Sequence, residues 1–339
     1  MSMIIDLAER GLMPDAAIRA GIRNLLSKRE KIESAQAVPL AEYIERLKRE
    51  PVAVETGAAN EQHYEVPAEF FVKTLGPRLK YSCCLYPEDA TPLARAEELM
   101  LALTCERAEL ADGQEILELG CGWGSLSIWM AEHYPKSRIL AVSNSNGQRE
   151  FITARAAALG LRNLEVVTCD MNHFDPASRT FDRAVSIEMF EHMRNYHELL
   201  RRVSTWLRPA GKLFVHIFTH RAFHYLFETD GDDNWMGRYF FTGGQMPSRG
   251  LLPAFNEHLE CERQWTVNGK HYARTLEDWL VLADQRRKEV LPVFEKTYGR
   301  DAKRWFQRWR MFYMACAELF AWDDGNAWDV THYLFRAKP

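Results

Sequence analysis

The chain has 339 residues, of which 47% are hydrophobic and 27% charged, and its net charge of −4 corresponds to a pI near 6.3. This length fits one large domain or a core domain with additions, and the acidic balance provides no basic field for nucleic acid or an anionic membrane. No uninterrupted apolar run approaches the roughly 18–20 residues of a spanning helix, so we expect no stable membrane insertion.

The cysteines and the N-terminal residues indicate the cellular compartment of the protein. The seven cysteines are scattered and form no C-x-x-C pair, so we expect neither a disulfide framework nor a metal site. The first ten residues mix acidic and basic side chains and lack the layout of a secretory signal peptide. These features predict a cytoplasmic protein in a reducing compartment.

The first 110 residues are expected to form a helical cap. Residues 14–30 carry apolar side chains on one helical face and basic ones on the other. A helix lying on a membrane surface is one interpretation, but we favour a helix docked on its own domain. The apolar positions are Ile18, Ile22, Leu25 and Leu26. Further helices are expected over residues 40–49, 66–75 and 92–109, and a linker over 56–62.

The most informative stretch is E-L-G-C-G-W-G at residues 118–124, between an apolar run typical of a buried strand and a helical run over 125–134. Glycines permit unusual backbone angles and remove Cβ atoms that would block a nucleotide-like ligand. The dinucleotide fingerprint has its third glycine one position later, and E-x-G-x-G-x-G instead resembles motif I of class I S-adenosylmethionine (SAM) methyltransferases. A structural turn or a dinucleotide site is the alternative. The candidate residues are Glu118, Gly120, Gly122 and Gly124.

Residues 111–339 are expected to form an α/β core domain. Alternation of strands and helices implies a mostly parallel sheet with right-handed crossovers, closed by two antiparallel strands. An aromatic-rich helical insert at about 274–322, with helices near 276–297 and 300–320, precedes the last strand. The expected strands lie near 115–120, 138–144, 164–170, 181–188, 212–220, 258–267 and 330–337. The other expected helices lie near 125–134, 146–159 and 197–207.

Polar residues end the second and third strands. Most nucleotide-binding α/β folds place an acid after the second strand to hold the ribose, whereas this chain offers the neutral groups Ser143, Asn144 and Gln148. This absence of charge disfavours a dehydrogenase. The third strand ends in Asp170 and Met171, where the acid is placed to accept from an adenine amino group. A turn or helix N-cap is almost as good an interpretation of Asp170.

The fourth strand ends in E-M-F-E-H, with Glu188, Glu191 and His192. If a helix began at Glu188, this spacing would place all three side chains on one side. Two neighbouring carboxylates raise each other's pKa, which makes a base usable near neutral pH. A solvated turn is the alternative, but catalytic groups sit at the carboxyl ends of such strands. His216 and His220 reach the same edge, although no ligand spacing requires a metal.

At this point the chain resembles a known family. It is similar to the cyclopropane-fatty-acyl-phospholipid-synthase-like SAM methyltransferases, and within them to the coclaurine-type N-methyltransferases. The resemblance covers essentially the whole chain. The shared strings lie at residues 60–67 (NEQHYEVP), 79–84 (LKYSCC), 118–125 (ELGCGWGS), 186–193 (SIEMFEHM), 238–247 (RYFFTGGQMP), 269–274 (GKHYAR) and 317–320 (AELF).

The resemblance implies roles at matching positions. Tyr81 and Ser82 would contact the methionine part of SAM, while Ser143 and Gln148 match the pair that holds its ribose. Cyclopropane synthases also hold a bicarbonate ion through a Cys, a Glu, a His and a Tyr. The first three match Cys83, Glu191 and His216, whereas the tyrosine falls at Phe312, next to Tyr313. A glycine common in the synthases falls at Glu188, whose charge would repel bicarbonate and attract an ammonium cation.

We therefore expect a SAM-dependent methyltransferase that methylates the nitrogen of a small amine, with an aromatic, alkaloid-like acceptor favoured by the resemblance. Glu188 or Glu191, with His192, would bind the ammonium and take its proton. Aromatic side chains would exclude water and flank the cation. These are Tyr239, Phe240, Phe241, Trp305, Trp309, Phe312, Tyr313 and Trp322, although plain core packing accounts for some of them.

Two other functions stay open. One is a cyclopropane synthase or lipid C-methyltransferase, and the other is a SAM-binding regulatory module without catalysis, which the intact E-x-x-E-H makes less attractive. A homodimer is also left open by the sequence.

Overall fold

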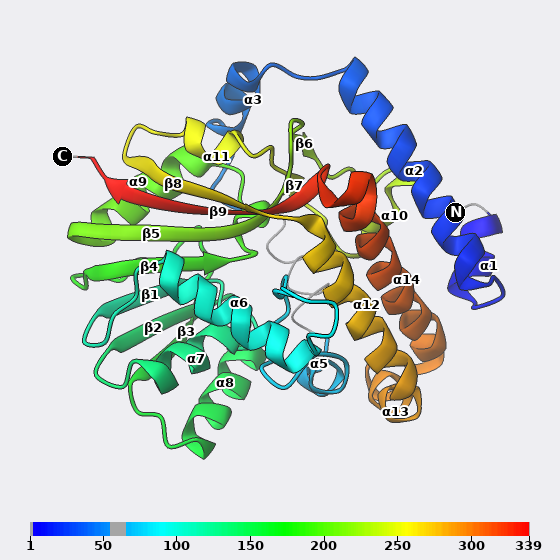
Figure 1. Ribbon diagram of the computed structural model, residues 1–339, viewed down its shortest axis with the longest axis horizontal. Coiled ribbons are helices and arrows are strands. Elements are labelled where there is room, and N and C mark those ends of the chain that lie inside the picture. Colours follow the sequence, from blue (N-terminus) through cyan, green and yellow to red (C-terminus); the bar gives the residue numbers. More distant parts are fainter. Residues whose placement is uncertain (1–2, 55–65, 339) are drawn as a thin grey trace.

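The computed structural model describes residues 3–54 and 66–338, which form a layered α/β core with a helical lobe at one end (Figure 1). The linker expected over 56–62 lies outside the described residues. The core is a seven-stranded sheet with the order β3-β2-β1-β4-β5-β9-β8. These strands are β1 (Glu115–Leu119), β2 (Arg138–Ser143), β3 (Leu164–Thr168), β4 (Phe181–Ile187), β5 (Leu207–His220), β8 (Leu259–Val267) and β9 (Trp328–Ala337).

Strand directions agree with the sequence-based expectation except at β8, which was expected to be antiparallel but runs in the same direction as the parallel strands. The pairs from β3 to β5 are parallel, and β9 pairs antiparallel with both β5 and β8. Within this sheet β9 therefore runs against the others. A separate two-stranded ladder joins β6 (Tyr225–Leu226) to β7 (Gln245–Met246). The mostly parallel sheet with an antiparallel last strand is confirmed.

Helices cover both faces of the sheet, which is why its central strands are near-continuous apolar runs. One face packs on α6 (Leu93–Arg107), α7 (Ser125–His133) and α8 (Asn146–Ala158). The other packs on α3 (Leu40–Leu47), α9 (Tyr196–Trp206) and α11 (Leu251–Ala254).

The helical lobe stands beside the carboxyl edge of the parallel strands (Figure 1). It contains α12 (Gly269–Gln285), α13 (Arg287–Tyr298) and α14 (Ala302–Ala321), joined by α5 (Ala68–Thr74) and α10 (Trp235–Tyr239). The N-terminal helices α1 (Met3–Glu9) and α2 (Asp15–Ala35) lie along the outside of α14. Ile18 and Leu26 of α2 are buried there, so docking on its own domain is confirmed for this amphipathic helix.

Two boundary differences from the sequence-based expectation lie in the helical insert, and β5 also begins earlier than expected, at Leu207. The helix expected over 276–297 is two helices that meet at Arg286, whose backbone leaves helical geometry without a glycine or proline to mark the break. The first of them begins earlier, at Gly269, because the Asn268 side chain caps it by accepting from the Lys270 amide at 2.9 Å.

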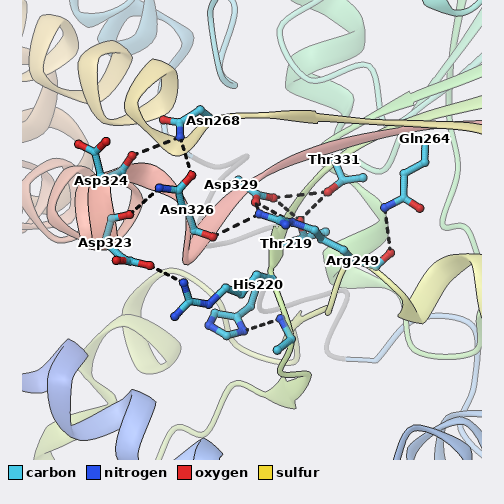
Figure 2. A network of polar contacts seen from close by, with 12 residues as sticks. Thr219, His220, Arg249, Gln264, Asn268, Asp323, Asp324, Asn326, Asp329 and Thr331 are labelled. Carbon is cyan, nitrogen blue, oxygen red and sulfur yellow. Dashed lines mark hydrogen bonds and ion pairs between the residues drawn. The ribbon is translucent and has the colours of Figure 1, made fainter.

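A polar network fastens the lobe to the sheet where α14 returns to β9 (Figure 2). Asp329 at the start of β9 is fully buried, accepts from Arg249 Nε at 2.8 Å and from the Thr219 hydroxyl at 2.6 Å. Asn268 donates to the Asp324 carbonyl at 3.2 Å, so the beginning of α12 is tied to the same corner. The network thus fixes how the lobe sits against the sheet edge.

We predict that Arg249→Met strongly destabilises the fold, because it leaves the Asp329 carboxylate buried without its cation. Removing one partner of a buried ion pair costs about 3–5 kcal/mol. The double variant Arg249→Met/Asp329→Asn should recover part of this loss. Urea unfolding followed by circular dichroism measures both, and equal stability of wild type and Arg249→Met would contradict the role given to the network.

Candidate active site

The glycine loop turns β1 into α7 with three glycines at alternate positions, Gly120, Gly122 and Gly124, all at positive φ. A Cβ on Gly120 would meet Met189 Cβ at 2.7 Å, and one on Gly124 would meet Ile152 Cγ1 at 2.7 Å. A Cβ on Gly122 would meet no protein atom within 4 Å. The outer two glycines therefore permit packing, whereas the middle one leaves open space.

A second loop is held opposite by a buried carboxylate. Glu97 on α6 accepts from the backbone N–H of Arg78 at 2.8 Å and of Lys80 at 3.1 Å. Gly76 leaves room for this carboxyl, since its Cβ would lie 2.5 Å from Glu97 Cδ. The loop so anchored presents Tyr81 and Ser82 to the space beside the glycine loop.

The polar ends of the next two strands are also ordered. The Ser143 hydroxyl donates to Gln148 Oε1 at 2.7 Å and accepts from the Ser145 amide at 3.0 Å, in a buried network. The Asp170 carboxylate accepts from the Asn172 amide at 2.7 Å, so Asp170 is at least a turn residue.

A cavity of about 740 Å³ joins these loops to the helical lobe. Several predicted site residues line it: Tyr81, Ser82, Glu118, Gly120, Gly122, Gln148, Glu188, Glu191, His192 and Phe312. Others do not line it: Cys83, Gly124, Ser143, Asn144, Asp170, Met171, His216, Tyr239, Phe240, Trp309, Tyr313 and Trp322. The sequence-predicted cofactor loop and the carboxylate pair therefore share one cavity.

The carboxylate pair reaches the cavity by an unexpected backbone path. The α-helix considered at Glu188 does not form: this residue has φ +48°, and a short 3₁₀ turn follows at Phe190–His192. A left-handed conformation is unfavourable for a residue with a Cβ and, as an observed outlier, points to function. Glu188 and Glu191 still face the same cavity.

Burial raises the pKa of the Glu188 carboxyl to about 7 and that of Glu191 well above its ordinary value. Each also senses the other: a protonated Glu191 that hydrogen-bonds to Glu188 lowers the pKa of Glu188, and the Glu188 charge raises that of Glu191. We assign the proton of the pair to Glu191 and the charge to Glu188. Neither Glu188 oxygen has a hydrogen bond of regular geometry with the described residues.

Lys80, which lines the cavity, favours the charged form of Glu188, and the buried His216 lies beside this carboxyl group. Lys80 is almost wholly buried, donates to the Ser82 hydroxyl at 2.5 Å, and its positive charge lowers the pKa of Glu188. His216 Nε2 lies 3.2 Å from Glu188 Oε1. His220, expected at the same edge, instead accepts two backbone amides through Nδ1, from Ala222 and Phe223.

The aromatic residues divide into a wall and a core. Phe312 lines the cavity, and Phe240 stacks on it from behind, with ring centroids 4.4 Å apart. Trp309 and Tyr313 are buried in the same aromatic core. The Arg308 guanidinium lies over the rings of both Tyr239 and Trp305, so their cation–π contacts are made within the protein. Trp322 donates to Glu30 on α2 at 2.9 Å.

Sequence reasoning missed part of the cavity wall. Apolar residues of α2 and the non-aromatic face of α14 line it: Ile18, Ile22, Leu25, Met311, Ala315, Cys316 and Leu319. The signal was present, since Ala315, Cys316 and Leu319 follow Phe312 at helical spacing. Aromatic residue type alone does not reveal these positions, because aromatic residues on the same helix also occupy core positions.

The fold and the cavity place this chain among the class I SAM methyltransferases. It belongs to the mycolic acid cyclopropane synthetase family, whose model matches residues 54–330. It is 36% identical to an (S)-coclaurine N-methyltransferase and 33% identical to a pavine N-methyltransferase, both from Thalictrum flavum subsp. glaucum. Each alignment covers 99% of this chain, with 97% and 96% of the respective relative.

A solved structure agrees with these relatives. The structure of coclaurine N-methyltransferase bound to N-methylheliamine and S-adenosylhomocysteine superposes with a TM-score of 0.94 at 35% identity. The match covers 98% of both chains. The described residues contain no helix with the length and apolar character needed to cross a bilayer.

We predict that Glu191→Gln flattens the pH dependence of stability. Both pair members have folded pKa values above the ordinary 4.5, so the native state holds protons that the unfolded chain releases. The free energy of unfolding should therefore fall as pH rises above about 4.5, through the folded pKa values.

Urea unfolding of wild type and Glu191→Gln between about pH 5 and pH 8 tests this, with Glu42→Gln, at an exposed position, as the control. A slope for Glu191→Gln equal to that of wild type would show that Glu191 does not hold the proton.

Proposed function

We propose that this protein is a SAM-dependent N-methyltransferase whose acceptor is a small, aromatic, alkaloid-like amine. The observation that carries the proposal is the Glu188–Glu191 pair at the end of an otherwise largely apolar cavity bounded by the glycine loop. A carboxylate there attracts an ammonium cation, and the apolar wall accommodates a hydrophobic body. The similarity to amine-specific relatives over almost the whole chain supports the same reaction.

The residues around the glycine loop fit SAM. Glu118 is buried, burial raises its pKa to about 8, and only the Ser127 hydroxyl hydrogen-bonds to it among the described residues. A cationic amino group, such as that of the methionine part of SAM, would restore its charge. Ser125 Oγ and Trp123 Nε1 are buried beside it without hydrogen-bond partners among the described residues, and both residues line the cavity. We assign the cofactor to Tyr81, Ser82, Glu118, Gly120, Gly122 and Gln148, with Gly124, Ser143, Asn144, Asp170 and Met171 in support.

The protein contributes positioning and proton handling. Bound SAM supplies an electrophilic methyl group on its sulfonium. An amine arrives protonated and has no lone pair, so Glu188 binds the ammonium and accepts one proton, which leaves a neutral nitrogen free to attack. His192 lines the cavity close to the pair and helps to orient the substrate. Phe312 and the apolar faces of α2 and α14 exclude water, which strengthens the pairing of the two charges.

The proposal also covers the N-terminal cap, the cellular location and the oligomeric state of the protein. The N-terminal 110 residues act as a cap and lid, supported by α2 in the cavity wall and by its ion pairs from Arg19 to Glu277 and Glu318. A cytoplasmic location is supported by seven free thiols. A homodimer would cover Met3 and Ile4, which are exposed on α1, and light scattering during gel filtration would detect it.

We expect Gly122→Val to abolish SAM binding while the protein stays folded, because a branched side chain would enter the open space beside the loop. Gly113→Val is the matched control, since Gly113 also has positive φ and open space but does not line the cavity. Calorimetric titration measures the affinity and thermal melting measures the fold. Unchanged SAM affinity in Gly122→Val would remove the loop from the cofactor site, and thermal protection by NAD but not by SAM would overturn the class.

Glu188→Gln should lower the rate of amine methylation near neutral pH by roughly two orders of magnitude or more, the usual scale of general-base catalysis. Part of the rate should return at high pH, where more of the amine is already neutral. Added bicarbonate should not stimulate the wild type, because Glu188 repels an anion and Phe312 replaces a hydroxyl-bearing ligand. A bicarbonate requirement, or transfer to phospholipid instead of amine, would favour the cyclopropane-synthase alternative.

A second variant separates folding from chemistry. Glu188→Gly should melt at the same temperature as wild type or higher, because glycine accepts φ +48° and no buried carboxyl remains. Its methylation rate should nevertheless fall as far as that of Glu188→Gln.

A further inference from the structure

A line of polar side chains runs from the half-buried Arg107 at the end of α6 to Glu188 in the cavity. Arg107 Nη1 lies 2.9 Å from His332 Nδ1, and His332 Nε2 lies 2.8 Å from His216 Nδ1. His216 Nε2 in turn lies 3.2 Å from Glu188 Oε1, a close contact outside regular hydrogen-bond geometry. The two histidines face each other across the β5–β9 ladder, and both are completely buried. Trp265 lies under the Arg107 guanidinium, 5.1 Å from it, and helps to hold it there.

Each proton in this line has one allowed position. A guanidinium can donate but never accept, so His332 Nδ1 must carry a lone pair. Burial and the nearby charges of Arg107 and Lys80 lower the pKa of both imidazoles well below 6.5, which leaves each ring neutral with a single proton. The His332 proton is therefore on Nε2 and points at His216 Nδ1. The proton of His216 must then be on its own Nε2, the atom that faces Glu188.

We propose that Arg107 fixes the tautomers of His332 and His216, an arrangement we call the tautomer lock. The lock presents the His216 N–H to Glu188. It thereby keeps Glu188, rather than Glu191, as the carboxylate that receives the amine. The proposal rests on the proposed N-methyltransferase function and adds positioning residues to it. Arg107 and His332 touch neither the cavity nor its contents, so they act only through His216.

The same chemistry excludes a proton wire along this path. A proton leaving Glu188 would have to enter His216 at Nε2, which already carries one, and leave His332 at Nδ1 towards a guanidinium that cannot accept it. The proton taken from the amine therefore leaves through the cavity and not through the β5–β9 ladder.

Beside the Glu191 carboxyl and the Phe218 backbone amide, the surroundings of Glu188 leave His216 as the neutral ring that faces it. The titratable and charged groups that face it come from several elements and include Lys80, Cys83, Glu191, His216, Tyr272 and Cys316. Burial raises the pKa values of the two thiols and of the Tyr272 phenol, so these groups stay neutral. Lys80 places a positive charge near the Glu188 carboxylate, and the His216 N–H faces one of its oxygens. If His216 presented its lone pair instead, it would favour a protonated Glu188.

Substitutions at His332 test the lock. His332→Gln keeps an N–H at the position of Nε2, whereas His332→Phe keeps a ring and removes the donor. We expect His332→Phe to move the acidic limb of the kcat/KM profile for amine methylation upward by about one pH unit, the scale of one hydrogen bond to a charged group. His332→Gln should follow the wild-type profile.

Arg107→Met extends the test to the surface end of the line and should shift the same limb in the same direction, with Arg107→Lys closer to wild type. Arg183→Met is the matched control, because Arg183 bonds the Ala108 and Glu109 carbonyls beside the same helix end but is not part of the line. Equal profiles for wild type, His332→Phe and Arg107→Met would overturn the lock. Equal shifts in His332→Phe and His332→Gln would also overturn it, because the donor would then not matter.

A measurement on the wild type needs neither activity nor a variant that folds. In protein labelled with ¹⁵N-histidine, His216 and His332 should both show the tautomer with the proton on Nε2 and a bare Nδ1, near neutral pH and without substrate. A proton on Nδ1 of either ring would overturn the proposal. If the wild type methylated no amine, the proposed function would fail while this spectrum would still decide whether the lock exists.

Discussion

The interaction on which the site depends is the burial of two carboxyl groups side by side at the carboxyl edge of the sheet. Water would normally screen both charges, but Glu188 and Glu191 lie in a largely apolar cavity where burial raises the pKa of each. The structure resolves the conflict by leaving one proton on Glu191 and surrounding Glu188 with Lys80 and His216. The cavity thus holds a single negative charge whose natural partner is a cation.

Much of this arrangement could be predicted from the sequence because it depends on local patterns. Apolar runs ending in polar residues predict parallel strands, and parallel strands bring their carboxyl ends to one edge, so Glu118, Gln148 and Glu188 were expected together. The break at Arg286 and the 3₁₀ turn after Met189 were not predictable. Neither has a glycine or proline at its break, and both are held by residues far away in the chain: Arg286 donates to the Lys73 carbonyl, and the Glu188 amide donates to the His216 carbonyl.

The aromatic residues show a different limit of sequence reasoning. Residue type predicts that a tryptophan or phenylalanine on α14 will be buried, but not whether it faces a ligand or another ring. Phe312 lines the cavity while Trp309, on the same helix, is in the core behind it. Tyr239 and Trp305 both face the Arg308 guanidinium, so their rings already contact a cation of the protein itself. Similarly, Arg107 and His332 belong to no motif, and only the pairing of β5 with β9 connects them to Glu188.

The backbone at Glu188 links the chemistry to the fold. Its φ of +48° suits glycine, the residue common at this position in the synthases that the chain resembles, and a side chain there costs about 1–2 kcal/mol. A carboxylate in this conformation is held against both backbone preference and burial, so stability alone would not select it. The same scaffold without this side chain would leave a protonatable Glu191 and Lys80 in the cavity, with the neutral His216 behind its wall, which suits an anion. One substitution at the end of β4 is therefore enough to change the sign of the charge that the cavity accepts.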